Sequence, residues 1–186
     1  MSGKLILVVG PSGVGKDTLI ETAKEYLAED DRFIFPRRYI TRPEGAGGEN
    51  HKALTVQEFL EKQEKNRFAL SWQAHGLHYG IPVSTIRDVS NGNTVIINTS
   101  RTILEEAKAK YDAVRVAYVN AKAETLRDRL KARGRESEHE IEQRINRATA
   151  YDLKGPEIFA IDNSGPLEVA VQPFVKLISD PLRASA

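Results

Sequence analysis

The amino-acid sequence predicts a three-layer α/β protein in which a parallel central sheet lies between two layers of helices. Two observations support this prediction. Short apolar runs rich in β-branched residues alternate with stretches of helical periodicity, the pattern of buried parallel strands and their crossover helices. In addition, the first apolar run ends in a glycine-rich loop that leads directly into a predicted helix. With 186 residues the chain can bury one sizeable core, so we expect residues 1–186 to form a single domain.

The predicted elements follow one another in a regular order. The run Leu5–Val9 is apolar throughout, and helical spacing of apolar residues begins at Thr18. Further predicted strands lie at 94–97, 114–119 and 158–161. Helices are predicted after them at about 101–111, 123–130 and 167–178. Because each strand is followed by a helix, the sheet is expected to be parallel and covered on both faces.

Two stretches interrupt this alternation. Residues of about 33–82 contain prolines, glycines and short strand-like pieces such as Phe68–Trp72, which predicts a small insert on the sheet. Residues of about 127–147 form a highly charged helical pattern that is broken at Gly134, which predicts a helical hairpin. Each interruption is a candidate for a part that binds or covers a substrate.

Composition excludes several classes of function. The 27 Lys+Arg residues nearly balance the 26 Asp+Glu residues, so neither nucleic acid nor a membrane surface is an expected partner. The absence of cysteine excludes disulfides, thiolate catalysis and Cys-based metal sites. The N-terminal apolar run is too short for a signal peptide or a membrane span, so a cytoplasmic location is expected.

A phosphate-binding loop follows the first strand. Its seven residues are Gly10, Pro11, Ser12, Gly13, Val14, Gly15 and Lys16, and they match G-x-x-x-x-G-K between a predicted strand and a predicted helix. In this context the backbone N–H groups and the helix N-terminus can bind phosphate oxygens, while Lys16 reaches the β and γ phosphates. The fold class is therefore that of the P-loop NTPases, and ATP is the expected nucleotide.

The residue after the loop lysine departs from the usual Ser or Thr. This chain has Asp17, followed by Thr18. A carboxylate at this place would repel a triphosphate unless it binds Mg²⁺ directly or through water, which makes Asp17 a candidate metal ligand. Alternatively, Asp17 is an acid that stabilises the helix N-terminus and leaves the metal to phosphates and water. Thr18 is expected to give its hydroxyl to the α phosphate.

Two groups of arginines indicate a kinase rather than a hydrolase. Four arginines and no acid lie within 32–42, and the predicted hairpin carries Arg133, Arg135, Arg144 and Arg147. Such groups on either side of a phosphate loop suit a phosphorylated acceptor and a lid that closes over the transferring group. The alternative for the hairpin is a solvated charged face with pairs such as Glu140 and Arg144.

The chain resembles the guanylate kinase family over nearly its full length. The matching segments are GPSGVGK at 10–16, ITR at 40–42, HGLHYG at 75–80, RLKARG at 129–134, EIEQRINRA at 140–148 and IDN at 161–163. The resemblance implies that Arg42 binds the acceptor phosphate and that Tyr79 faces the same pocket. It further implies that Arg133 and Arg144 stabilise the transferring phosphoryl group from the lid. Asn163 would lie by the adenine of ATP.

Three features of the sequence depart from that family's pattern. The second acceptor-site arginine of the family is here Gly45, and the base-reading glutamate falls on Leu70. The acid pair expected after the central strand is Asn98 and Ser100. A leucine cannot accept hydrogen bonds from a guanine ring, and losing such contacts changes specificity by orders of magnitude. Guanylate is therefore not the expected acceptor.

The same departures are found in the ribose 1,5-bisphosphate phosphokinase family of phosphonate catabolism, which this chain resembles over its whole length. The GKD variant of the loop and the segment SWQAHGLHYGIP at 71–82 are the most specific matches. The resemblance implies transfer of the γ-phosphoryl of ATP to the 1-phosphate of ribose 1,5-bisphosphate, giving 5-phospho-α-D-ribose 1-diphosphate. An acceptor with two phosphates and no base fits the residues that remain. The candidates to hold one phosphate are Arg37, Arg38 and Arg42, and those to meet hydroxyls or the other phosphate are His51, Gln73, His75, His78 and Tyr79.

Two alternatives stay open from the sequence. One is a nucleoside monophosphate kinase with a different base preference, and the other is a non-catalytic guanylate kinase-like binding module. The intact loop with Lys16 and the arginines of the hairpin favour an enzyme, because a binding module needs neither. The oligomeric state is also open, with a homodimer among the possibilities.

Overall fold

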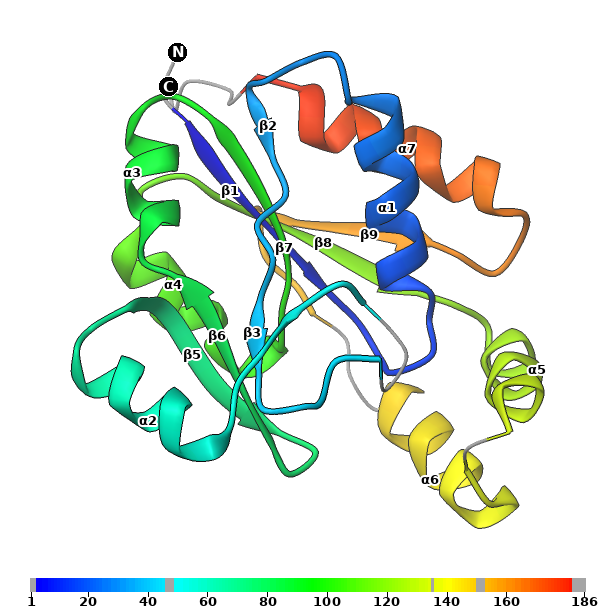
Figure 1. Cartoon of the computed structure of the whole chain (residues 1–186). Helices are drawn as coiled ribbons and strands as arrows, with labels where there is room; N and C mark the ends of the chain where they lie inside the picture. The colour runs from blue at the N-terminus through cyan, green and yellow to red at the C-terminus, as the bar shows by residue number, and fades with distance from the viewer. Residues whose placement is uncertain (1–2, 46–48, 135, 150–152, 182–186) are drawn as a thin grey trace.

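A computed structural model describes residues 3–45, 49–134, 136–149 and 153–181 of the chain. It consists of a central sheet with helices on both faces, a smaller sheet to one side, and a helical hairpin at the other side (Figure 1). The α/β class and the parallel central sheet predicted from the sequence are confirmed. None of the helices in the described ranges is long and apolar enough to span a membrane.

The central sheet has five strands in the order β2-β7-β1-β8-β9, and every neighbouring pair is parallel. The strands are β1 (Lys4–Val9), β2 (Phe33–Ile34), β7 (Thr94–Asn98), β8 (Val114–Asn120) and β9 (Ile158–Asp162). The chain leaves β1 toward one edge of the sheet and later crosses to the other edge. In such sheets a crevice opens outside the carboxyl ends of the strands, and ligands bind there.

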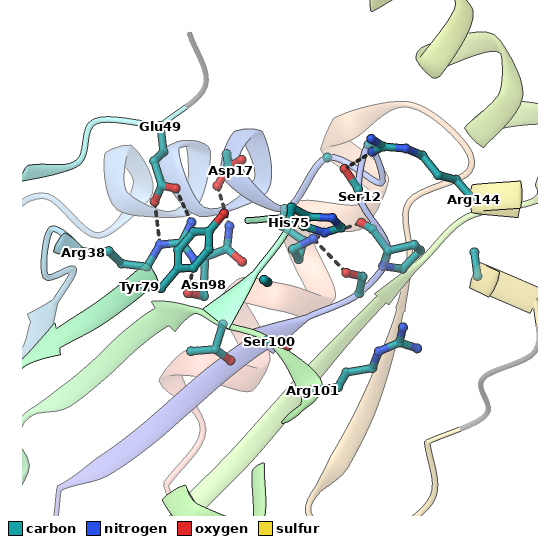
Figure 2. A pocket seen from close by; sticks show the side chains of 18 of the residues that line it. Ser12, Asp17, Arg38, Glu49, His75, Tyr79, Asn98, Ser100, Arg101 and Arg144 are labelled. Carbon is teal, nitrogen blue, oxygen red and sulfur yellow. Dashed lines mark hydrogen bonds and ion pairs between the residues drawn. The ribbon is translucent and has the colours of Figure 1, made fainter. Parts of the chain in front are cut away.

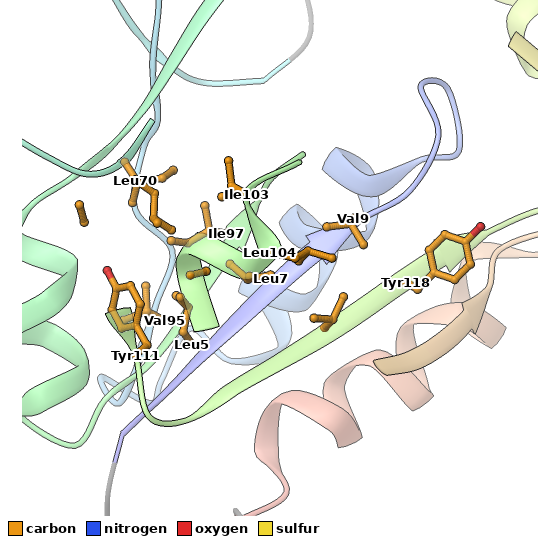
Figure 3. Close-up of a cluster of buried hydrophobic side chains, with 14 residues drawn as sticks. Leu5, Leu7, Val9, Leu70, Val95, Ile97, Ile103, Leu104, Tyr111 and Tyr118 are labelled. Atoms are coloured by element: carbon orange, nitrogen blue, oxygen red, sulfur yellow. The ribbon is translucent and has the colours of Figure 1, made fainter. Parts of the chain in front are cut away.

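Helices cover both faces of this sheet. One face carries α1 (Lys16–Tyr26) and α7 (Leu167–Ser179), while the other carries α3 (Ser84–Ser90), a 3₁₀ turn (Arg101–Ile103) and α4 (Leu104–Lys110). Ile6 and Val8 of β1 pack with residues of α1 and α7, including Phe174. Leu5 and Leu7 belong to the other core cluster (Figure 3). Burial on both faces explains why the β1 sequence is a continuous apolar run.

The insert forms a second sheet with the order β4-β3-β6-β5, flanked by one helix. Its elements are β3 (Tyr39–Ile40), β4 (Lys52–Ala53), α2 (Val56–Glu64), β5 (Phe68–Ala74) and β6 (Leu77–Pro82). The sequence placed the start of the insert near residue 33, but Phe33–Ile34 pairs with β7 in the central sheet. Leu70 and Ile81 attach the insert to the main body, because both are buried in the same core cluster as Leu5.

The helical hairpin consists of α5 (Ala123–Arg133) and α6 (Glu138–Thr149). Gly134 ends α5 in the left-handed conformation, with a φ of 64°, which glycine adopts without steric cost. Leu126 and Leu130 of α5 pack with Ile141 and Ile145 of α6 in a separate small cluster. The hairpin therefore holds itself together by its own apolar contacts. Arg135, one of the arginines noted in the sequence, lies outside the described residues.

The packing of α7 leads to a stability prediction. Phe174 is fully buried against the central sheet, whereas Val169 on the same helix is 64% exposed. We expect Phe174→Ala to lower the free energy of unfolding by about 3–5 kcal/mol, because a large cavity remains in the core. The control Val169→Ala should change it by less than about 0.5 kcal/mol. Urea unfolding followed by circular dichroism measures both values, and equal midpoints for the two variants would contradict this packing.

Candidate active site

A cavity of about 560 Å³ lies where the crevice was expected, at the carboxyl ends of β1 and β7. The phosphate loop lies on one side of it, the insert on another, and the helical hairpin closes a third (Figure 2). Its lining includes most of the predicted site: Gly10, Pro11, Ser12, Gly13, Gly15, Lys16, Asp17, Thr18, Arg38, Arg42, His75, Tyr79, Arg133 and Arg144. The fold thus brings together residues from four separate parts of the sequence.

The conformation of the phosphate loop depends on the burial of one of its residues. The Val14 side chain is fully buried in the core beneath α1 and α7. Its carbonyl oxygen accepts hydrogen bonds from Asn163 Nδ2 at 2.7 Å and from Arg129 Nη1 at 3.2 Å. At Gly15 the φ is +92°, and a Cβ there would lie 2.6 Å from Asn163 Nδ2. Glycine is required at this position for both reasons.

Lys16 lies across the mouth of the loop. Its ammonium donates to the carbonyl oxygens of Gly10 at 2.8 Å and Pro11 at 2.9 Å. Burial, together with the positive charges of Arg38 and Arg101, lowers the pKa of Lys16 to about 8, although the carboxylates of Asp17 and Glu49 oppose this shift. A bound phosphate would give the Lys16 ammonium a fully charged partner in place of two neutral carbonyl oxygens. The site therefore favours a phosphate beside Lys16.

Asp17 extends from the first turn of α1 into the cavity. Its Oδ1 accepts a hydrogen bond of 2.6 Å from Asn98 Nδ2, which comes from the end of β7 (Figure 2). In the β1–β7 pairing Asn98 lies opposite Val8, which is one residue before the end of β1. The two polar side chains that the sequence singled out as departures are therefore neighbours in space.

The acceptor side of the cavity contains a buried ion pair. Arg38 donates from Nε to Glu49 Oε2 at 2.7 Å, and its Nη2 donates to Glu49 Oε1. Its Nη1 donates to the carbonyl oxygen of Asn98 at 2.8 Å. The guanidinium also lies over the ring of Tyr79, 5.3 Å from its centroid. Arg38 is therefore held rigidly by groups of both the insert and the central sheet.

Arg42 is less completely paired than Arg38. Its Nη2 lies 3.9 Å from Glu49 Oε1 and 3.4 Å from His51 Nδ1. Its Nε is buried without a hydrogen-bond partner among the described residues. A buried donor without a partner costs free energy, and an anionic ligand would supply the missing acceptor. This geometry suits the predicted role of Arg42 in binding the acceptor phosphate.

An aromatic pair forms the wall behind these arginines. The rings of Trp72 on β5 and Tyr79 on β6 are stacked with centroids 5.2 Å apart and planes 5° apart. Both side chains line the cavity. Leu70, two residues before Trp72, is buried in the core cluster shared with the central sheet instead. The position that would read a guanine ring is therefore occupied by core packing.

The structure separates three of the predicted histidine and glutamine contacts. His75 lines the cavity and lies in the tight turn between β5 and β6, with a φ of 52°. His78 does not line it: side chains alternate along β6, so His78 packs on Phe59 of α2, with ring centroids 5.1 Å apart. Gln73 bonds to His78 at 2.8 Å and lies outside the lining as well.

Arg37 and His51 support the arginine wall from behind. Arg37 Nη2 donates to the carbonyl oxygen of His51 at 2.7 Å. The His51 ring is buried, with Nε2 2.9 Å from the carbonyl oxygen of Arg42 and Nδ1 3.1 Å from that of Glu49. Neither residue lines the cavity. Their contacts place the backbone that carries Arg38 and Arg42.

Arginines of the hairpin approach the phosphate loop from the opposite side. Arg144 Nη1 donates to Ser12 Oγ at 2.9 Å, and its Nη2 lies 3.3 Å from Glu136 Oε1. Arg133 is exposed and lines the cavity, as does Arg147. The predicted hairpin thus carries positive charge to the loop rather than only to solvent, although its outer face also has surface pairs such as Arg127 with Glu142.

The resemblance implies that Asn163 lies by the adenine of ATP. Asn163 is 3% exposed and lies behind the phosphate loop, where it holds the Val14 carbonyl. Its Oδ1 is buried without a hydrogen-bond partner among the described residues. Asn163 does not line the cavity, and its observed contacts are those of a loop support.

Sequence reasoning missed three residues of this site. Glu49 pairs with Arg38, Arg101 lines the cavity at the start of the 3₁₀ turn, and Arg129 supports the loop. Glu49 follows a glycine-rich stretch without periodicity, so no pattern indicated its direction. Arg101 comes directly after Ser100 at a strand end facing the crevice, and that position was a usable signal.

A phosphate loop that faces an arginine-bearing wall and an arginine-bearing hairpin defines a P-loop phosphotransferase. Comparison with known families agrees, since the guanylate kinase model matches residues 2–163. The guanylate kinase from Anaplasma phagocytophilum has a related structure, with a TM-score of 0.66 and 17% identity over 95% of this chain and 84% of that chain. At this identity the likeness shows the fold alone.

Relatives whose sequences are much more similar to this chain identify the group within the family to which it belongs. The ribose 1,5-bisphosphate phosphokinase of Brucella melitensis is 40% identical over 173 residues, covering 93% of this chain and 90% of the relative. That of Thiobacillus denitrificans is 43% identical over 178 residues, covering 96% and 94%. The chain therefore belongs to the guanylate kinase family and, within it, to the ribose 1,5-bisphosphate phosphokinases. It is an enzyme, a kinase.

The Arg38–Glu49 pair leads to a prediction about stability. Glu49→Ala leaves the guanidinium of Arg38 buried without a counter-charge, so we expect the free energy of unfolding to fall by about 3 kcal/mol. Glu44→Ala removes an exposed carboxylate of the same insert and serves as the control. Because Trp72 is the single tryptophan and lies beside Arg38, its fluorescence can report urea unfolding. Equal urea midpoints for the two variants would show that Glu49 does not hold Arg38.

Proposed function

We propose that this chain transfers the γ-phosphoryl group of ATP to the 1-phosphate of ribose 1,5-bisphosphate, yielding ADP and 5-phospho-α-D-ribose 1-diphosphate. The observation that carries the proposal is the cavity itself, whose acceptor wall offers arginines and stacked aromatic rings while Leu70 is buried in the core. Such a wall suits a base-free sugar phosphate. We further propose that residues 1–186 act as one catalytic domain, with the insert binding the acceptor and the hairpin serving as the lid.

The donor would bind at the phosphate loop. Backbone N–H groups of residues 10–16 and the N-terminus of α1 would bind the phosphates, with Lys16 beside the β and γ phosphates and Thr18 near the α phosphate. Asn163 would hold the loop in the shape that this binding needs. These contacts fix the γ-phosphorus relative to the acceptor wall, and positioning of this kind supplies much of the rate enhancement in phosphoryl transfer.

The acceptor would bind between the insert and the lid. Arg42, whose Nε has no partner among the described residues, is the first candidate for a phosphate of the bisphosphate. Arg38 has donors left over after its bonds to Glu49 and Asn98, and Tyr79 and His75 also face the cavity. We assign no substrate contact to His78, which lies on the other face of β6.

The chemical step needs no general base. An oxygen of the 1-phosphate is already anionic near neutral pH and forms the new bond to the γ-phosphorus. The bond from the γ-phosphorus to the bridging oxygen breaks, and its electrons remain on the β-phosphate of ADP. Lys16, Arg133 and Arg144 would neutralise the charge that spreads over the transferring group. Closure of the lid would exclude water and prevent hydrolysis of ATP.

Magnesium is the expected metal, and the residues present fit it. Among the described residues no group of three acidic or histidine side chains could hold a metal ion. Mg²⁺ commonly binds one or two carboxylates, phosphate oxygens and water rather than an all-protein cage. Asp17 follows Lys16 directly and lines the cavity, so it would provide the carboxylate. When bound, Mg²⁺ would neutralise charge on the phosphates.

An acceptor panel tests the proposed reaction. Mg-ATP is supplied with ribose 1,5-bisphosphate, GMP, AMP or no acceptor, and ADP formation is followed while the product is identified by mass. We expect turnover with the bisphosphate alone. Preferential turnover of GMP or AMP would support a nucleotide kinase instead. No turnover with any acceptor, together with retained ATP binding in calorimetry, would support a binding module.

Lid arginines should affect turnover more than ATP binding. An arginine aimed at a transferring phosphoryl group contributes about 10³–10⁵ to the rate in related enzymes. We therefore expect Arg144→Ala and Arg133→Ala to lower kcat by about 10²-fold or more while the Kd for ATP changes by less than about tenfold. Steady-state kinetics and calorimetry measure the two quantities. Arg127→Ala, which removes a surface pair of the same hairpin, is the control, and near-normal kcat in Arg144→Ala would refute the lid assignment.

The lowered pKa of Lys16 makes ATP binding pH-dependent. In the free protein this pKa is about 8, and bound phosphates would raise it. ATP binding should therefore take up a proton near pH 8, and affinity should fall by up to about tenfold per pH unit above that value. Calorimetry in buffers of different ionisation enthalpy measures the uptake. Lys16→Met should bind ATP weakly without this uptake and should lack activity; an unchanged uptake would show that another group titrates.

A further inference from the structure

Two residues of this site differ from the common magnesium ligands of P-loop enzymes. In P-loop enzymes Mg²⁺ is commonly held by a Ser or Thr hydroxyl directly after the loop lysine and by an Asp at the end of the neighbouring strand. In this chain the residue after Lys16 is Asp17, and the strand end next to β1 carries Asn98. In this chain the carboxylate is therefore on the helix, and the end of the neighbouring strand carries an uncharged side chain.

Asp17 and Asn98 are hydrogen-bonded to each other. Asn98 Nδ2 donates to Asp17 Oδ1 at 2.6 Å, although the residues are 81 positions apart in the chain. Asn98 lies at the end of β7, paired with the central strand of the sheet, and its carbonyl oxygen is held by Arg38. The amide therefore extends from a fixed piece of backbone, whereas Asp17 is an exposed side chain on the first turn of a helix.

Other carboxylates are poorly placed to replace Asp17. Among the described residues that line the cavity, Asp17 and Glu49 are the acids. Both oxygens of Glu49 are hydrogen-bonded to Arg38. Asp17 Oδ1 is bonded to Asn98, and no hydrogen bond from a described residue reaches Oδ2. This oxygen is the available anionic ligand beside the phosphate loop.

We propose that Asn98 is a positioning residue, which holds the Asp17 carboxylate so that Oδ2 faces the Mg²⁺ of bound Mg-ATP. The inference rests on the proposed use of Mg-ATP and is independent of which acceptor is phosphorylated. An amide suits this task because it donates a hydrogen bond without adding charge. An aspartate at position 98 would instead place a second negative charge against Asp17 Oδ1 and repel the Asp17 carboxylate from this position.

Restoring the common arrangement, with a hydroxyl at position 17 and a carboxylate at position 98, tests this inference. Mn²⁺ replaces Mg²⁺, and the electron paramagnetic resonance signal of free Mn²⁺ is titrated with protein that is saturated with a non-hydrolysable ATP analogue. The variants are Asn98→Ala, Asn98→Asp, Asp17→Ser and the double variant Asp17→Ser with Asn98→Asp. Thr102→Ala, an exposed hydroxyl four residues beyond Asn98, is the control. Thermal unfolding of each variant shows that it is folded.

We expect Asn98→Ala and Asp17→Ser each to weaken Mn²⁺ binding about tenfold or more, because groups that orient a metal ligand commonly contribute this much. Asn98→Asp should weaken it as a single change but strengthen it in the Asp17→Ser background. This reversal of sign is a coupling between the two sites that general damage to the fold would not produce. Thr102→Ala should bind Mn²⁺ as the unchanged protein does.

Two results would overturn the inference. Unchanged Mn²⁺ affinity in Asn98→Ala would show that Asp17 needs no support. A folded double variant that binds Mn²⁺ no better than Asp17→Ser would show that position 98 does not face the metal. Both readouts measure metal binding and not turnover. A negative result in the acceptor panel would therefore leave this test valid, and a negative result here would leave the proposed reaction untouched.

Discussion

The site depends on how one backbone carbonyl is held. Val14 places its side chain in the core, and its carbonyl oxygen is bonded to Asn163 from the segment after β9 and to Arg129 from α5. The central sheet, the phosphate loop and the hairpin therefore meet at a single oxygen atom. A loop of several glycines has many accessible conformations, and this contact selects one of them before any ligand arrives. Preorganisation of this kind lowers the entropic cost of binding a phosphate.

Charge balance is the second constraint on the cavity. Its lining includes Lys16 and six arginines but, among the described residues, two acids. Glu49 neutralises Arg38, and Asp17 lies close enough to affect the pKa of Lys16. Without these acids the empty cavity would concentrate strong repulsion in a partly buried space. The excess that remains is positive, which suits a donor and an acceptor that both carry several phosphates. The two acids thus stabilise the unliganded fold without removing its preference for anions.

Much of the fold could be predicted because its signals are local. The Leu5–Val9 run is apolar on both faces, and the loop that follows needs its glycines, so strand, loop and helix were all visible in the sequence. The strand Phe33–Ile34 was assigned to the insert because two residues show no periodicity. Side-chain direction was harder: alternation along β6 turns His78 away from the cavity that Tyr79 faces, and Asn163 points toward the loop rather than the cavity. Glu49 was missed because its position depends on Arg38, a contact that no local pattern encodes.

The environment of Leu70 is set by packing as well as by the lack of a hydrogen-bond acceptor. Leu70 is 1% exposed in a cluster with Ile81 and Leu5, so it helps to attach the insert to the central sheet. A glutamate at that position would bury a charge among apolar side chains, which is costly unless the charge is paired. On the cavity side, the guanidinium of Arg38 lies over the rings of Trp72 and Tyr79. This part of the cavity wall is therefore a positively charged side chain that is held in place by hydrogen bonds. Both residues act on Trp72: Leu70 anchors the strand that carries it, and Arg38 lies over its ring. Residue 70 therefore belongs to the packing between the insert and the central sheet, and we expect that a change at this residue alone would not create a base-reading site.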